Sequence, residues 1–146
     1  MIPADYLSTL ARIESGNRPF VKAKTSSASG LYQFTRKTWT DLGGAWGPHD
    51  DLAFGGLEPT PTEQIARARE LTQENADHLA AHGLDATSAN LYGAHFLGPH
   101  LAALALKADD ADHLARIVGP AVVKANEFLA DFSVADFKAW LDRKVA

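Results

Sequence analysis

Apolar residues recur every three or four positions along most of the chain, the spacing that predicts amphipathic helices. We expect a first helix from Pro3 to about Glu14, where Ser15-Gly16-Asn17 breaks the pattern. The clearest helix start is Thr60-Pro61-Thr62-Glu63, in which Thr60 is the N-cap, Pro61 takes the first helical position and Glu63 completes a capping box. That helix is expected to run to about His82 and to end at Gly83.

The rest of the chain shows the same pattern, punctuated by glycine and proline. Residues 43–59 form its loosest stretch, and long loops of this kind are usually functional or mobile. Further helices are expected over 35–42, 87–97, 99–107, 110–118, 120–129 and from about 134 onward. The pattern therefore predicts a mainly α fold, a single domain of seven or eight short helices spanning residues 1–146.

The composition supports a helical fold and argues against several kinds of functional site. The chain holds 26 Ala and 17 Leu, which favour helix, against 4 Ile and 6 Val. The absence of cysteine excludes disulfides, thiolate metal sites and a cysteine nucleophile. A net charge of −4 argues against nucleic acid as a partner, and no apolar run is long enough to span a membrane, so we expect no membrane insertion.

Glu14 is the most informative candidate for chemistry. A carboxylate at the C-terminal end of a helix is unfavourable, because that end of the helix dipole is negative. The position of Glu14 therefore needs an explanation. A carboxyl group that acts as a general acid near neutral pH needs partial burial against apolar surface, and Glu14 follows Ile13 on the apolar side of its helix. The alternative is an ordinary solvated glutamate, which is the commoner case for an acidic residue taken alone.

Three motifs around Glu14 occur in an order that resembles the soluble lytic transglycosylases. They are Glu14-Ser15-Gly16, then Gly30-Leu31-Tyr32-Gln33-Phe34 after a serine-rich loop, then Tyr92-Gly93-Ala94-His95-Phe96-Leu97-Gly98. The third is similar to the phage-associated branch of that family, as is Ala125-Asn126-Glu127-Phe128. The resemblance extends from Tyr6 to about Trp140.

The resemblance implies a lysozyme-like fold of the goose type and an enzyme that cleaves peptidoglycan between N-acetylmuramic acid and N-acetylglucosamine. Glu14 would protonate the glycosidic oxygen and then take the proton of the muramoyl 6-hydroxyl, which closes a 1,6-anhydro ring. No cofactor and no metal are expected. The predicted substrate-binding residues are Ser15, Ser26, Tyr32, Gln33, Tyr92, His95 and Phe96.

Gln33 and the aromatic candidates have structural alternatives. Gln33 is equally suited to hydrogen-bond the backbone of a turn. Tyr32, Phe34 and Phe96 can either stack on sugar rings or belong to the core, where Trp39, Phe137 and Trp140 are expected.

Departures from the family pattern leave other functions open. Phe96 stands where the family has asparagine, Lys24 stands near a usual serine, and no tyrosine follows Tyr92. These changes leave room for a hydrolytic lysozyme or endolysin, a chitinase-like hydrolase, or an inactive glycan-binding module of a phage tail. Asp50 and Asp51 are candidates for a second carboxylate, and His78 with His82 for a zinc pair, but for both a solvated surface role is the commoner case.

The expected partner is the glycan strand of peptidoglycan in the bacterial periplasm or cell wall. The start of the chain lacks the basic and apolar regions of a signal peptide, which favours a phage endolysin or a virion-associated protein. We expect a monomer, free or as part of a phage particle or a larger tail protein.

Overall fold

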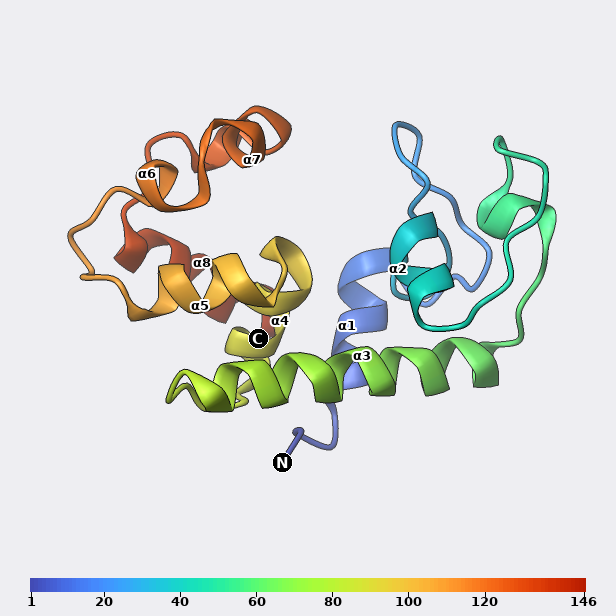
Figure 1. The fold of residues 1–146 in the computed structure, drawn as a ribbon, viewed down its shortest axis with the longest axis horizontal. Coiled ribbons are helices and arrows are strands. Elements are labelled where there is room, and N and C mark those ends of the chain that lie inside the picture. The colour runs from blue at the N-terminus through green and yellow to red at the C-terminus, as the bar shows by residue number, and fades with distance from the viewer. The chain divides into compact units, whose positions relative to one another are not determined.

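The computed structural model describes residues 1–146, of which 59% are helical and none lie in strands (Figure 1). The prediction of a mainly α protein with seven or eight helices is confirmed, while its lysozyme-like topology stays a prediction. None of the helices combines the length and the apolar character needed to cross a bilayer. The helices are α1 (Tyr6–Ser15), α2 (Arg36–Asp41), η1 (Ala53–Gly56), α3 (Pro61–Ala81), α4 (Ser88–Leu97), α5 (Pro99–Lys107), α6 (Leu114–Val118), α7 (Pro120–Ala125), η2 (Glu127–Leu129) and α8 (Val134–Val145).

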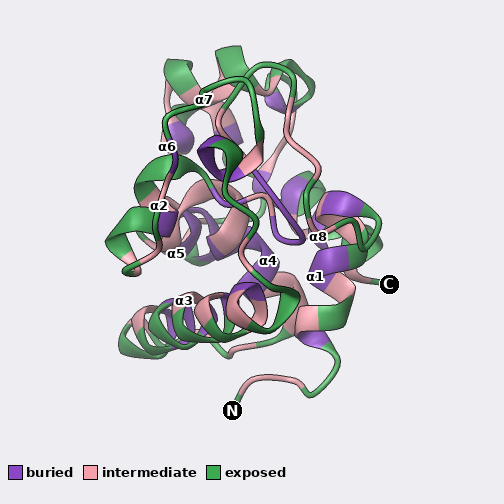
Figure 2. Ribbon diagram, turned by 90° about the vertical axis from the view of Figure 1, so that its right-hand side faces the viewer, coloured by how far each residue is buried: buried purple, intermediate pink, exposed green.

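The chain divides into two compact units, and the division falls within α3. The N-terminal unit is Ala4–Leu71, and the C-terminal unit is Thr72–Ala146 together with Met1–Pro3. Each unit is described by itself below. Figure 2 shows buried positions alternating with exposed ones along α3, as the amphipathic spacing predicts.

Helix packing builds the C-terminal unit. Helix α4 packs against α5 and α8, α5 packs against α6, and α6 packs against α7. Ser133 caps α8 through a capping box with Asp136, as its position before the last apolar stripe predicts. The hydrogen bonds that Ser133 gives the carboxylate of Asp136 lower the pKa of that group. The fully buried side chains of this unit include the leucines Leu79, Leu91, Leu114, Leu129 and Leu141.

Two predicted helices of this unit are shorter than the sequence suggests. The helix expected over 110–118 begins only at Leu114, because residues 110–114 pair with the segment before α8. Leu114 N–H donates to the carbonyl of Phe132, and Val134 N–H donates to the carbonyl of Asp112. The helix expected over 120–129 is interrupted at Asn126, whose backbone is not helical, and continues as the 3-10 helix η2. Tertiary pairing therefore takes precedence over local helix propensity here.

An aromatic core fills the N-terminal unit. Phe34, Trp39 and Phe54 are almost completely buried, and their rings lie 4.9–5.1 Å apart between neighbours. Tyr32 contacts Phe34 edge-on at 6.1 Å, and Trp46 contacts Phe54 at 5.8 Å. Trp39 is thus a core residue, in agreement with its helical spacing.

The glycine-rich stretch 43–59 is tied to this core. Phe54 is fully buried and adopts a left-handed backbone conformation. Gly47 and Gly55 approach so closely that a Cβ on Gly55 would lie 2.2 Å from the carbonyl oxygen of Gly47. Only glycine fits such a contact, so these glycines fold the stretch into a defined loop.

Candidate functional site

Glu14 lies in the last turn of α1 and is half-buried. The helix ends immediately after it, because Gly16 and Asn17 both adopt left-handed conformations. Their N–H groups cap the carbonyls of Arg12 and Ala11, respectively. The predicted position of Glu14 at the end of the first helix is confirmed, although the helix starts at Tyr6 rather than at Pro3.

Ser15 shapes the turn that follows Glu14. Its side chain is 2% exposed, and its hydroxyl donates to the carbonyl of Ala11 over 3.0 Å and accepts from the N–H of Arg18 over 3.1 Å. The guanidinium of Arg18 also donates to the carbonyl of Ser15 over 2.7 Å. These contacts account for Ser15 as a structural residue that directs the chain from α1 into the loop.

The side chain of Gln64 on α3 anchors the loop that follows α1. Its side chain is 0% exposed, and its carbonyl oxygen accepts from Leu31 N–H over 2.9 Å. Its amide nitrogen donates to the carbonyls of Pro19 over 2.9 Å and Pro59 over 3.0 Å. One side chain thus satisfies three backbone groups from three parts of the N-terminal unit.

Ser29 makes a second buried link. Its hydroxyl donates to the carbonyl of Ser27 over 2.8 Å and accepts from Phe54 N–H over 3.0 Å. The adjacent Gly30 leaves no room for a Cβ, which would lie 2.4 Å from the side-chain oxygen of Gln64. The loop is therefore a rigid element with fixed backbone positions.

Gln33 and Tyr32 both have structural roles in this loop. The amide nitrogen of Gln33 donates to the carbonyls of Gly30 over 3.0 Å and Val21 over 3.2 Å, which is the turn role that its residue type allows. Tyr32 is only 3% exposed, so its ring does not offer a face to a sugar in this conformation. Burial raises the pKa of the Tyr32 hydroxyl, and the charge of Arg69 partly offsets that shift.

Ser26 lies in a groove of about 450 Å³ on the outer side of the loop. The hairpin from Lys22 to Ser29, closed by the backbone pairing of Ala23 with Ala28, forms one wall. The start of α2 and the loop after it contribute the remainder. The lining residues are Lys22, Lys24, Thr25, Ser26, Ser27, Arg36, Trp46 and Asp50.

The predicted residues of the third motif all lie on α4, in the C-terminal unit. Tyr92 is almost buried, while His95 and Phe96 are half-buried. Tyr92 and Phe96 contact the ring of Trp140 at 5.8 and 5.0 Å, and Phe128 contacts Trp140 at 5.2 Å. Phe128 is 48% exposed, so this aromatic cluster reaches the surface of its unit.

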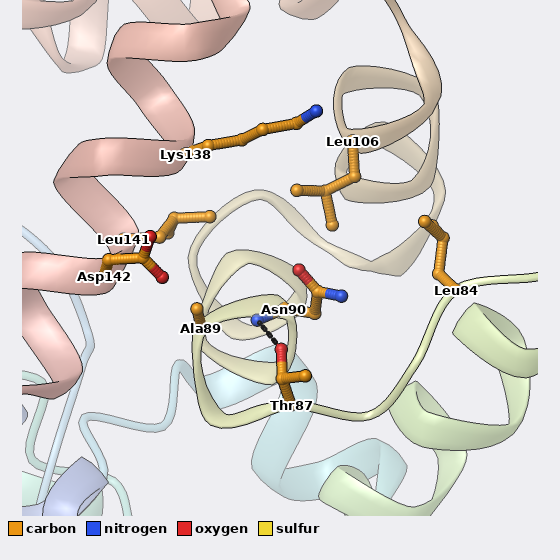
Figure 3. A pocket seen from close by; sticks show the side chains of 8 residues that line it. All are labelled: Leu84, Thr87, Ala89, Asn90, Leu106, Lys138, Leu141 and Asp142. Atoms are coloured by element: carbon orange, nitrogen blue, oxygen red, sulfur yellow. Dashed lines mark hydrogen bonds between the residues drawn. The ribbon is translucent and has the colours of Figure 1, made fainter.

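A second hollow, of about 340 Å³, lies between α4, α5 and α8 of the C-terminal unit (Figure 3). Leu84, Leu106 and Leu141 line it, and two of its polar side chains already have partners. Lys138 donates to the carboxylate of Asp110 over 2.8 Å, and Asn90 donates to the carbonyl of Asp85 over 2.8 Å. We interpret this hollow as a crevice of helix packing.

His78 and His82 lie on one face of α3 with their rings 4.8 Å apart. The structure contains no group of three or more residues able to hold a metal ion. Partial burial lowers the pKa of His82, and the nearby charges of His78, Lys107 and His100 lower it further.

This arrangement predicts an acid-sensitive C-terminal unit. A histidine whose pKa is lowered by folding binds fewer protons in the folded state than in the unfolded state. It therefore lowers the free energy of unfolding as the pH falls below about 6.5. We expect His82→Gln to reduce the loss of melting temperature between about pH 7.5 and about pH 5 relative to the parent. Equal losses in the two proteins would contradict this expectation.

No family model matches the chain.

Sequence reasoning missed two groups of residues that the structure brings forward. Gln64 looks like a surface residue of an amphipathic helix, and only the fold reveals its three backbone partners. The groove lined by Lys22, Lys24 and Arg36 could have been predicted from the sequence as a site of positive charge. The 26 residues between Glu14 and Asp41 contain five Lys or Arg and no carboxylate. Trp140 was expected in the core, but it is half-exposed.

Proposed function

We propose that the protein cleaves the glycan strands of peptidoglycan between N-acetylmuramic acid and N-acetylglucosamine, with Glu14 as the general acid and base. The observation that carries the proposal is the position of Glu14. This half-buried carboxyl group ends α1 directly before a rigid loop that leads to a groove lined by hydroxyls, cations and Trp46. The three motifs that resemble lytic transglycosylases include this segment.

In the proposed reaction, the protonated Glu14 donates its proton to the glycosidic oxygen as the bond to C1 of the muramoyl residue breaks. The resulting carboxylate then removes the proton of the 6-hydroxyl of the same sugar. Oxygen O6 bonds to C1, which closes a 1,6-anhydro ring and returns Glu14 to its protonated form. One carboxyl group suffices for this sequence, whereas most glycosidases need two.

Within the C-terminal unit, the aromatic surface of α4 suits contacts to the apolar faces of sugars. Half-exposed rings suit this role because sugar rings pack on aromatic surfaces. Phe96 meets this condition, and His95 lies beside it on α4 and is half-buried as well. Tyr92 is nearly buried and contacts Trp140, so it supports the position of these side chains.

Hydrolysis is the second candidate outcome. The observation that favours it is Phe96, an apolar side chain packed on Trp140 where the family has a polar asparagine. If water reaches C1 before O6 does, the product is a reducing sugar in place of the anhydro ring. In either case the proposed site of action is the bacterial cell wall, reached as a phage endolysin or a virion-associated lysin.

Product analysis tests the proposal. Purified protein is incubated with purified peptidoglycan, and the released muropeptides are identified by mass spectrometry. We expect anhydro-muropeptides, and products one water heavier would assign hydrolysis. A protein that binds the wall but releases no muropeptide at high concentration would refute cleavage and favour a glycan-binding module. Chitin oligosaccharides provide the comparison that separates a chitinase-like enzyme.

A further inference from the structure

The groove beside the loop combines positive charge with hydroxyl groups and an aromatic ring. Lys22, Lys24 and Arg36 line it together with Ser26 and Trp46. The chain as a whole carries a net charge of −4, yet the segment that forms most of this groove contains no carboxylate between Glu14 and Asp41. The local charge is thus opposite in sign to the net charge, which is the pattern of a site for an anionic ligand.

The cations of the groove are only weakly compensated within the protein. Lys22 donates to the carbonyls of Ala23 over 2.9 Å and Ser26 over 3.0 Å, and these neutral partners fix the ammonium group without cancelling its charge. Arg36 lies 3.9 Å from Asp50, and both side chains are mostly exposed. Such exposed pairs are worth little, so a ligand carboxylate can replace Asp50 as the partner of Arg36.

The shape of the groove is fixed in advance. The hydroxyl of Ser27 accepts from Arg36 N–H over 3.0 Å, and this contact ties the hairpin to the start of α2. The hydroxyl of Ser26 accepts from Ala28 N–H over 3.2 Å. Trp46 is positioned by its edge contact with the buried Phe54. A ligand therefore meets a preformed backbone and the fixed ammonium of Lys22, so it loses little affinity to ordering of the protein backbone.

We propose that this groove binds a carboxylate of the peptide stem that peptidoglycan carries on its muramoyl residues. Lys24 and Arg36 pair with the carboxylate, the fixed ammonium of Lys22 adds to the positive field, and Trp46 packs against the apolar part of the same ligand. The choice of ligand rests on the proposed function. It makes the enzyme selective for stem-bearing glycan over chitin, which is built from N-acetylglucosamine and lacks such carboxylates.

A binding titration tests the inference without relying on cleavage. The probe is N-acetylmuramoyl-L-alanyl-D-isoglutamine, which has one free carboxylate, and its neutral counterpart is the same compound with that carboxylate amidated. Affinity is measured by NMR titration of the parent, the double variant K24M/R36Q and K37M. Lys37 is an exposed cation on α2 that pairs with Asp41 over 2.6 Å, so K37M is a matched control for loss of a surface charge.

We expect the parent and K37M to bind the acid probe about tenfold or more tightly than the amide, because charge-assisted hydrogen bonds are lost with the carboxylate. K24M/R36Q is expected to bind both probes equally weakly. The preference for the acid probe should also fall with added salt, which screens exposed charges. Equal affinity of the parent for both probes, or an unchanged preference in K24M/R36Q, would overturn the inference.

Cleavage assays separate this inference from the proposed function. On intact peptidoglycan K37M should match the parent and K24M/R36Q should be slower, and the parent should cleave strands stripped of their stems more slowly than intact peptidoglycan. A parent that prefers the acid probe but releases no muropeptide refutes the proposed cleavage and retains the binding site. A parent that cleaves both substrates equally and ignores the probe's charge refutes the binding site alone.

Discussion

Replacing Glu14 with glutamine is expected to reduce the release of muropeptides by about 10²- to 10⁴-fold, the usual contribution of a general acid or base. Glutamine has nearly the same shape as glutamate but neither donates a carboxyl proton nor accepts one as a carboxylate. The rate is measured by turbidity loss of permeabilised Gram-negative cells and by quantifying soluble muropeptides. A variant that clears walls as fast as the parent would refute the mechanism.

The matched control is Glu70→Gln. Glu70 is an exposed residue of α3 in the same N-terminal unit, so this variant removes the same charge from a helix without touching the end of α1. We expect it to keep the parental rate. Circular dichroism and thermal unfolding of both variants test whether they are folded, so that a lost rate in a folded Glu14→Gln variant reports chemistry rather than misfolding.

Replacing Gln64 with leucine is expected to destabilise the protein by at least about 3 kcal/mol. The change leaves Leu31 N–H and the carbonyls of Pro19 and Pro59 without their partner, and each unsatisfied buried group costs roughly 1–3 kcal/mol. For a chain of this length the melting temperature should fall by about 6–12 °C. Urea unfolding and calorimetry measure the loss.

The matched control lies on the same helix. Gln73 is exposed, and its amide donates to the carboxylate of Asp77, so Gln73→Leu should change stability by no more than about 0.5 kcal/mol. Gln64→Glu offers a further check. It retains an acceptor for Leu31 N–H but turns a carboxylate toward two carbonyl oxygens, so part of its stability should return when acid protonates the group. Similar losses in the two leucine variants would contradict the role assigned to Gln64.

The helices were predictable because capping residues and glycines near many helix ends determine where the helices begin and end. Thr35, Thr87 and Ser133 each cap a helix in the structure through their side-chain oxygens. Gly83 adopts the left-handed conformation expected of a residue that ends a helix. The errors arose where distant segments compete for backbone groups, as at residues 110–113, whose pairing with the segment before α8 no local rule describes.

The candidate site was predictable only in part. The place of Glu14 follows from the apolar stripe of α1 and from the glycine that ends it. The part played by Gln33 depends on which carbonyls the folded loop brings within reach, here those of Val21 and Gly30. Burial of Tyr32 depends on the aromatic core around Phe34, which is assembled from separated segments. Such contacts require the three-dimensional arrangement.

The residues that anchor the loop after α1 are separate from those that line the tip of its hairpin. Its fold depends on inward-facing polar groups, namely Ser29 and Gln64, whereas Lys24 and Thr25 at the hairpin tip face solvent. Substitutions at the tip are therefore expected to change the ligand preference proposed for the groove at little cost in folding free energy. Related chains that keep the anchors while varying the tip would share one scaffold and differ in the ligand that the groove binds.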